Sequence, residues 1–149
     1  MNHLLTVHIT RHDVKLSPPV TLPASGIRLE TRRGWVLELQ DSDGHRGRGL
    51  AAPLPGFSAE GADEVESALR VMSQPGARIH TSPLNSVEDL KALVGEGSFP
   101  PSVAHALEQA GLGLIAQRLQ TSPEALLGLG DEALPEHVLV QSAGDAQRA

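Results

Sequence analysis

The histidines are the first residues of this sequence to consider for chemistry, because imidazole is a common metal ligand. The chain of 149 residues has seven histidines and no cysteine, which rules out thiolate metal sites, cysteine nucleophiles and disulfides. His8 and His12 would share one face of a strand, but they would lie roughly 13 Å apart if the strand is regular. Others are scattered along the chain, at His45, His80, His105 and His137. We interpret them as surface residues rather than as a zinc site.

Arginines and glycines offer two further possibilities. Arg28, Arg32 and Arg33 could bind the carboxylate of a substrate, since a guanidinium forms paired hydrogen bonds with it. The simpler interpretation is that they are solvent-exposed residues in the segment that leads into a strand. Gly47-x-Gly49 does not indicate a dinucleotide site, because no helix follows directly and the third glycine of that fingerprint is missing.

The composition excludes several classes of protein. A net charge of -6 argues against nucleic acid, whose phosphates require clustered lysine and arginine. Aromatic residues make up only 2%, so single-stranded nucleic acid would find no stacking platform and the core must be leucine, valine and alanine. No signal peptide is visible, and no apolar run approaches the ~20 residues of a membrane helix. We expect a cytoplasmic protein without membrane or nucleic-acid partners.

The first third of the chain predicts a small antiparallel meander. Period-2 alternation predicts three strands, at residues 4–14, 35–40 and 46–51. Residues 41–44 form a turn in which Gly44 can supply a positive φ. The third strand requires that another backbone packs closely against Gly47 and Gly49. Residues 16–26 contain three prolines and predict a long loop, a feature that is often functional.

The rest of the chain predicts helices. Ser58, Ser86 and Ser122 are suitable N-caps for helices that begin near residues 59, 87 and 123. The longest helix runs from about residue 101 to 119, with its buried face formed by Val103, Leu107, Ala110 and Leu114. Gly111 and Gly113 each cost up to ~1 kcal/mol inside this helix, so we expect another element to approach it closely. The fold class is α+β, a three-stranded antiparallel meander followed by a helical bundle.

The segment at residues 52–58, Ala-Pro-Leu-Pro-Gly-Phe-Ser, joins the meander to the first helix. Taken alone, a rigid connector is the favoured interpretation, because proline and glycine are ordinary loop residues. At the other end of the chain, residues 138–140 form a fresh apolar run after the helices. A lone three-residue strand there has no evident partner and is positioned as the first element of a second domain would be. We therefore divide the chain into a first domain at residues 1–135 and the start of a second at residues 136–149.

These segments resemble the capping domain of the enolase superfamily, and within it o-succinylbenzoate synthase of menaquinone biosynthesis. The likeness is carried by residues 47–58, Gly-Arg-Gly-Leu-Ala-Ala-Pro-Leu-Pro-Gly-Phe-Ser, by Pro-Ser-Val-Ala-His-Ala-Leu-Glu at 101–108, and by the short helix at 123–128. It covers nearly the whole chain. The family usually has Glu where Leu50 stands, so a related racemase or epimerase stays open.

The resemblance implies a cap whose two loops, residues 16–26 and 52–57, close over a small carboxylate substrate. The implied contacts are Leu22, Ser25, Leu54, Pro55, Gly56 and Phe57. The family places its lysines and Mg²⁺ ligands in a (β/α)-barrel, which would be the partner of this cap. The barrel would start at residues 138–140, so we expect no catalytic or metal-binding residue in this chain and no bound cofactor.

Three functions follow as hypotheses. The first is that the chain is the capping domain of a synthase that dehydrates a cyclohexadiene carboxylate, and is a fragment that lacks the barrel domain. The second is the cap of an N-acylamino acid racemase or dipeptide epimerase. The third is a free-standing interaction module without enzymatic activity.

Overall fold

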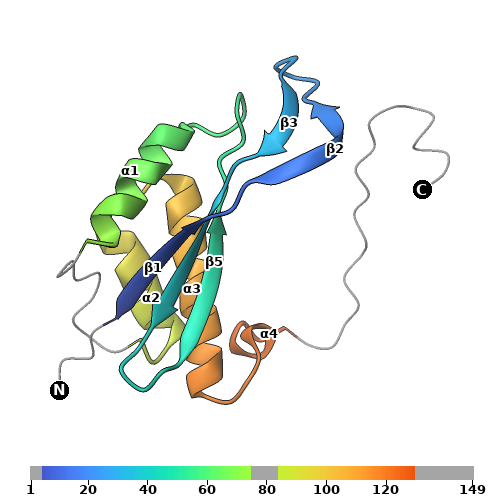
Figure 1. The fold of residues 1–149 in the computed structure, drawn as a ribbon. Coiled ribbons are helices and arrows are strands. Elements are labelled where there is room, and N and C mark those ends of the chain that lie inside the picture. The colour runs from blue at the N-terminus through green and yellow to red at the C-terminus, as the bar shows by residue number, and fades with distance from the viewer. Residues whose placement is uncertain (1–4, 75–83, 130–149) are drawn as a thin grey trace.

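The computed structural model describes residues 5–74 and 84–129, and its centre is a three-stranded antiparallel sheet (Figure 1). The strands are β1 (Thr6–Arg11), β4 (Trp35–Gln40) and β5 (Arg46–Ala51), in the order β1-β4-β5. The predicted α+β class and the three antiparallel strands are confirmed, although β1 ends at Arg11 instead of residue 14. The strand predicted at residues 138–140 and the domain boundary before it lie outside the described residues.

A second sheet is inserted between β1 and β4, where we predicted a long loop. β2 (Val14–Thr21) and β3 (Arg28–Arg32) form an antiparallel hairpin that projects from one end of the molecule (Figure 1). Its register shifts between Lys15 and Val20, the stretch that contains Pro18 and Pro19. Prolines are tolerated at such an irregularity because they need not donate to the ladder. The prediction of a loop at residues 16–26 was therefore wrong, and only residues 22–27 form the turn.

Helices cover one face of the three-stranded sheet (Figure 1). They are α1 (Ala62–Met72), α2 (Val87–Glu96), α3 (Pro101–Arg118) and the short α4 (Pro123–Leu126). Ser86 and Ser122 cap α2 and α4 as predicted, since their hydroxyls accept hydrogen bonds from Asp89 N at 3.2 Å and Ala125 N at 3.1 Å. Even α3, the longest helix of the described part at 18 residues, could not span a bilayer.

Ser58 does not cap α1, which corrects the prediction. The helix begins at Ala62, and its N-cap Gly61 makes no side-chain hydrogen bond. The hydroxyl of Ser58 instead accepts a hydrogen bond from Leu54 N at 2.8 Å, inside the preceding turn. The serine lies too early in the chain to reach the first helical turn.

Glycines allow α3 to lie directly on β5. A Cβ on Gly47 would lie 1.8 Å from Ala110 O, and one on Gly49 would lie 1.9 Å from Ala106 O. Any side chain at these positions would push the helix off the sheet, which confirms the expected close backbone approach. A Cβ on Gly113 would in turn lie 3.3 Å from Gly47 Cα. The predicted buried face of α3 is also confirmed, with all four residues fully buried: Val103, Leu107, Ala110 and Leu114.

Candidate functional site

The segment after β5 folds into a compact turn. The amides of Phe57 and Ser58 both donate to Leu54 O, at 3.0 and 2.9 Å, and Leu54 N donates back to the Ser58 hydroxyl. Gly56 has a φ of +73°, which glycine adopts at no steric cost. These bonds hold the turn in one shape. They leave the Phe57 side chain 82% exposed at its tip.

Arg32, at the end of β3, fixes the start of this segment. Its Nη1 donates to Pro53 O at 2.6 Å, and its Nη2 donates to Ala52 O. Burial lowers the pKa of the Arg32 guanidinium from its ordinary value, but an arginine stays protonated at any physiological pH. Two backbone carbonyls thus each take one N–H of the guanidinium, so both Nη groups bond to the protein's own backbone.

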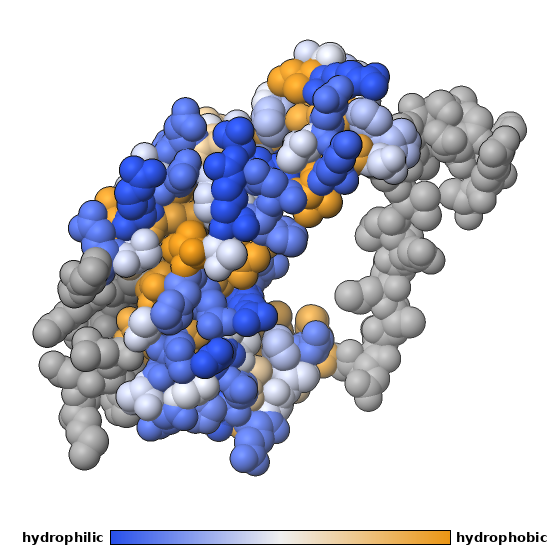
Figure 2. Space-filling model, in the orientation of Figure 1, coloured by the Kyte–Doolittle hydropathy of each residue, from blue (hydrophilic) through white to orange (hydrophobic). Residues whose placement is uncertain are grey.

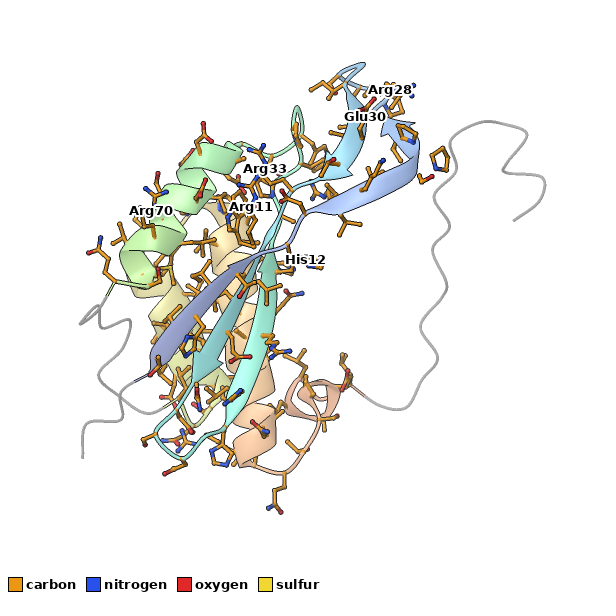
Figure 3. All side chains as sticks on the ribbon, viewed as in Figure 1. Arg11, His12, Arg28, Glu30, Arg33 and Arg70 are labelled. Atoms are coloured by element: carbon orange, nitrogen blue, oxygen red, sulfur yellow. The ribbon has the colours of Figure 1, made fainter. Side chains whose placement is uncertain are left out.

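The other two arginines of the sequence prediction do not join Arg32. Arg28 lies on the projecting hairpin beside Glu30, with 3.7 Å between Arg28 Nε and Glu30 Oε1 (Figure 3). Arg33 is exposed and lies nearer the three-stranded sheet (Figure 3). Each of the three arginines thus has its own surroundings, and the choice between carboxylate binding and a solvated position stays a prediction.

Glu60 anchors the other end of the segment, and sequence reasoning missed it. Glu60 lies two residues before α1, and its side chain is buried although it is acidic. Its Oε1 accepts hydrogen bonds from Ser102 N at 2.9 Å and from the Ser102 hydroxyl. The bond from the Ser102 side chain outweighs the effect of burial and lowers the pKa of Glu60. Its partner lies 42 residues away, so no local pattern could have indicated the contact.

The structure brings the hairpin tip, residues 22–27, against the turn at residues 54–58. A Cβ built on Gly56 would lie 2.9 Å from Ser25 Cβ and 2.8 Å from Ile27 Cδ1, so the tip of the hairpin touches the turn. Leu22 closes the hairpin tip by donating from its amide to Ile27 O at 2.8 Å. Both loops lie at the end of the molecule where Figure 2 shows apolar surface among polar groups. Substrate contact by the six named residues stays a prediction.

A magnesium ion finds no matching ligand set in the described residues. They contain one group of three possible ligands, Asp41, Asp43 and His45. Asp41 Oδ1 accepts from the amides of Asp43 and His45, both at 2.9 Å, and Oδ2 lies 2.9 Å from His45 Nδ1. Mg²⁺ needs free oxygen ligands in octahedral geometry, and here nitrogen donors already surround the buried carboxylate. The group therefore does not fit the metal and instead closes the β4–β5 turn.

The chain is similar in fold to solved members of the enolase superfamily. A superfamily member from Listeria innocua matches with a TM-score of 0.74 and 18% identity, over 99% of this chain and 40% of that one. A dipeptide epimerase from Methylococcus capsulatus was solved with Mg and the dipeptide L-Arg-D-Lys. It matches with a TM-score of 0.72 and 18% identity, over 99% of this chain and 41% of that one. A dipeptide epimerase from Cytophaga hutchinsonii was solved with Mg and the dipeptide D-Ala-L-Val. It matches with a TM-score of 0.70 and 18% identity, over 89% of this chain and 35% of that one.

These structures show that the chain has the fold of the N-terminal capping domain of enolase-superfamily members. The resemblance to this superfamily is confirmed by a match at the sequence level. A family model described as MenC, N-terminal domain, matches residues 5–114, and the chain belongs to that family. No curated protein matches the chain. The chain spans between 31% and 41% of the length of the solved proteins described above and their neighbours.

Proposed function

We propose that this chain is the capping domain of an o-succinylbenzoate synthase-like enzyme, and that residues 22–27 and 54–57 contact its substrate. The observation that carries the proposal is the contact between Gly56 and the Ser25 loop. Two segments that were selected separately from the sequence are adjacent in space, in a chain of the MenC N-terminal family. Adjacent loops at one end of a domain can cover a single substrate.

The side chains of these loops suit substrate recognition rather than catalysis. Leu22, Leu54, Pro55 and Phe57 offer apolar surface, and none of them can transfer a proton. An exposed aromatic ring on a rigid turn fits an apolar ring substrate such as a cyclohexadiene carboxylate. In this proposal the dehydration and the Mg²⁺ that would assist it belong to a (β/α)-barrel domain, and this chain contributes only contacts to the substrate.

A racemase or epimerase of amino-acid derivatives is the second candidate, and Leu50 favours it. The synthases that this chain resembles usually have Glu at that position. Leu50 is 41% exposed on the outer side of β5, and its amide donates to Gln109 Oε1 at 2.9 Å. Leu50 therefore offers no polar side chain at this strand end. The similar dipeptide epimerases share the fold at 18% identity, which does not decide between the two reactions.

The test is to assay the complete polypeptide for both the dehydration and the epimerisation reaction. We expect Phe57→Ala to raise KM about tenfold in the reaction that the protein catalyses, because a buried ring contact is worth roughly 1.5 kcal/mol or more. Val71→Ala is the matched control, since Val71 is 63% exposed on α1, away from both loops. Unchanged kinetics for Phe57→Ala, or a reading frame without a Lys-x-Lys strand and acidic metal ligands, would overturn the proposal.

A further inference from the structure

The β2–β3 hairpin is attached to the rest of the protein at few points. It forms its own two-stranded sheet, with no strand pairing to β1, β4 or β5 in the described structure. Its buried residue Leu29 lies outside the main hydrophobic core. An isolated two-stranded hairpin is marginally stable in water. Contacts with the segment after β5 must therefore contribute to holding the hairpin in place.

The first attachment point is the side chain of Arg32. Its two Nη groups donate to consecutive carbonyls, Pro53 O at 2.6 Å and Ala52 O. A planar guanidinium can contact two such oxygens at once, whereas a lysine ammonium offers a point charge without that fork. The charge also strengthens each hydrogen bond. Arg32 thus fixes the start of the turn to the end of β3.

The second attachment point lies at the hairpin tip. Gly56 meets Ser25 and Ile27 so closely that a Cβ at position 56 would overlap both. Arg28 and Arg32, the first and last residues of β3, are about 13 Å apart on a regular strand. The turn therefore lies along β3 and is held near both ends of it. Glu60 then ties the far end of the same segment to α3 through Ser102.

We propose that the hairpin tip (residues 22–27) and the turn (residues 54–58) form one rigid lid, and that Arg32 is a positioning residue that holds the start of the turn so that Gly56 keeps its contact with Ser25 and Ile27. The two loops open and close as a single body. A substrate that orders one loop then orders the other. The consequence for recognition rests on the proposed function above, but the mechanical joining of the two loops does not.

Amide hydrogen exchange, read by NMR on the chain without substrate, tests this joining. The reporters are the bonded amides of Leu22 and Gly26 in the tip and of Leu54, Phe57 and Ser58 in the turn. We expect Arg32→Gln to accelerate exchange about tenfold or more in both groups, because the turn loses its bonds to Arg32 and the tip then loses its contact with Gly56. Arg32→Lys should restore part of the protection. Acceleration confined to the turn, with the tip unchanged, would overturn the proposal.

Arg28→Gln is the matched control. Arg28 lies on the same strand and contacts Glu30 on the exposed surface, so both loops should keep wild-type exchange. If Arg32→Gln does not fold, native-state exchange of the wild-type chain in low denaturant decides the question. The two groups of amides should then open with the same free energy, and two different values would overturn the proposal.

The two proposals can fail separately. Joined loops together with wild-type kinetics for Phe57→Ala would refute the substrate role and leave the rigid lid standing. Independent loops together with a raised KM for Phe57→Ala would refute the rigid lid and leave the substrate role standing.

Discussion

Glu60 Oε1 accepts a hydrogen bond from Ser102 N at 2.9 Å and so connects the loop after β5 to the first turn of α3. Ser102 occupies a helix N-terminus where amides have no intrahelical partner and where the helix dipole favours a negative charge. Glu60 thus caps a helix that begins some forty residues later. The contact ties the end of the loop after β5 to the helix that lies on the sheet.

This contact makes the stability of the protein pH-dependent. The pKa of Glu60 lies below its ordinary value of 4.5 in the folded protein, mainly because of the Ser102 hydrogen bond. The folded state therefore binds the proton less readily than the unfolded state. The stabilisation is fully present above pH 4.5 and is lost as the pH falls through the folded pKa.

The measurement is urea unfolding of wild type and Glu60→Gln between pH 3 and 7. We expect a smaller loss of unfolding free energy at low pH in the variant, because its amide does not titrate. Asp41, whose pKa is also lowered, still titrates in both proteins and provides the common background. Parallel curves for the two proteins would show that Glu60 contributes nothing to the pH dependence.

Two glycine substitutions should change the stability of the protein in opposite directions, one at the α3–β5 contact and one within α2. Gly49→Ala should destabilise the protein by about 3 kcal/mol, because the new Cβ would lie 1.9 Å from Ala106 O and the helix must move. Gly95→Ala lies within α2, where a Cβ meets nothing within 4 Å. It should stabilise the protein by up to ~1 kcal/mol through helix propensity. Chemical denaturation measures both, and equal stabilities would contradict the packing described here.

We expect replacement of Asp41 to lower the stability of the protein, and we expect added Mg²⁺ to leave that stability unchanged. Burial raises its pKa, but the hydrogen bonds from His45 and from the Asp43 amide outweigh burial and lower it overall. Asp41→Asn should cost about 2 kcal/mol, because His45 and the nearby Arg118 lose a charged partner. Millimolar Mg²⁺ should leave the thermal midpoint of the wild-type chain unchanged. A rise that disappears in Asp41→Asn would instead identify this turn as a metal site.

Two glutamines of α3 protect the open edge of the sheet. Gln109 Oε1 accepts from Leu50 N at 2.9 Å, and Gln117 Oε1 accepts from Arg46 N. Unpaired edge amides favour pairing with another chain. The double substitution Gln109→Leu, Gln117→Leu should therefore increase self-association, measured by analytical ultracentrifugation. Gln74→Leu is the control, because it adds a similar apolar side chain at another exposed position. It should keep the association state of the wild-type protein. Equal association of the control and the double variant would show that surface hydrophobicity alone causes the effect.

Local sequence signals predicted much of the fold, because their partners are close in the chain. Ser86 and Ser122 precede helices whose free amides lie three residues further on, so the capping pattern is visible in the sequence. The prediction at residues 16–26 failed because β2 depends on pairing with β3 in spite of its prolines. Ser58 carries an equally good capping signal, but the turn that contains it ends before α1 begins.

The sequence by itself determined the family, the three-stranded sheet and the main helices, and it singled out the two segments of the proposed lid. These features depend on residue type and short-range spacing, which one chain displays in full. Only the tertiary structure decided that Ser25 touches Gly56, that Arg32 binds the carbonyls of Ala52 and Pro53, and that Glu60 reaches Ser102. Each of these contacts joins residues that are 20 or more positions apart, and such pairs become neighbours only when the strands and helices have packed.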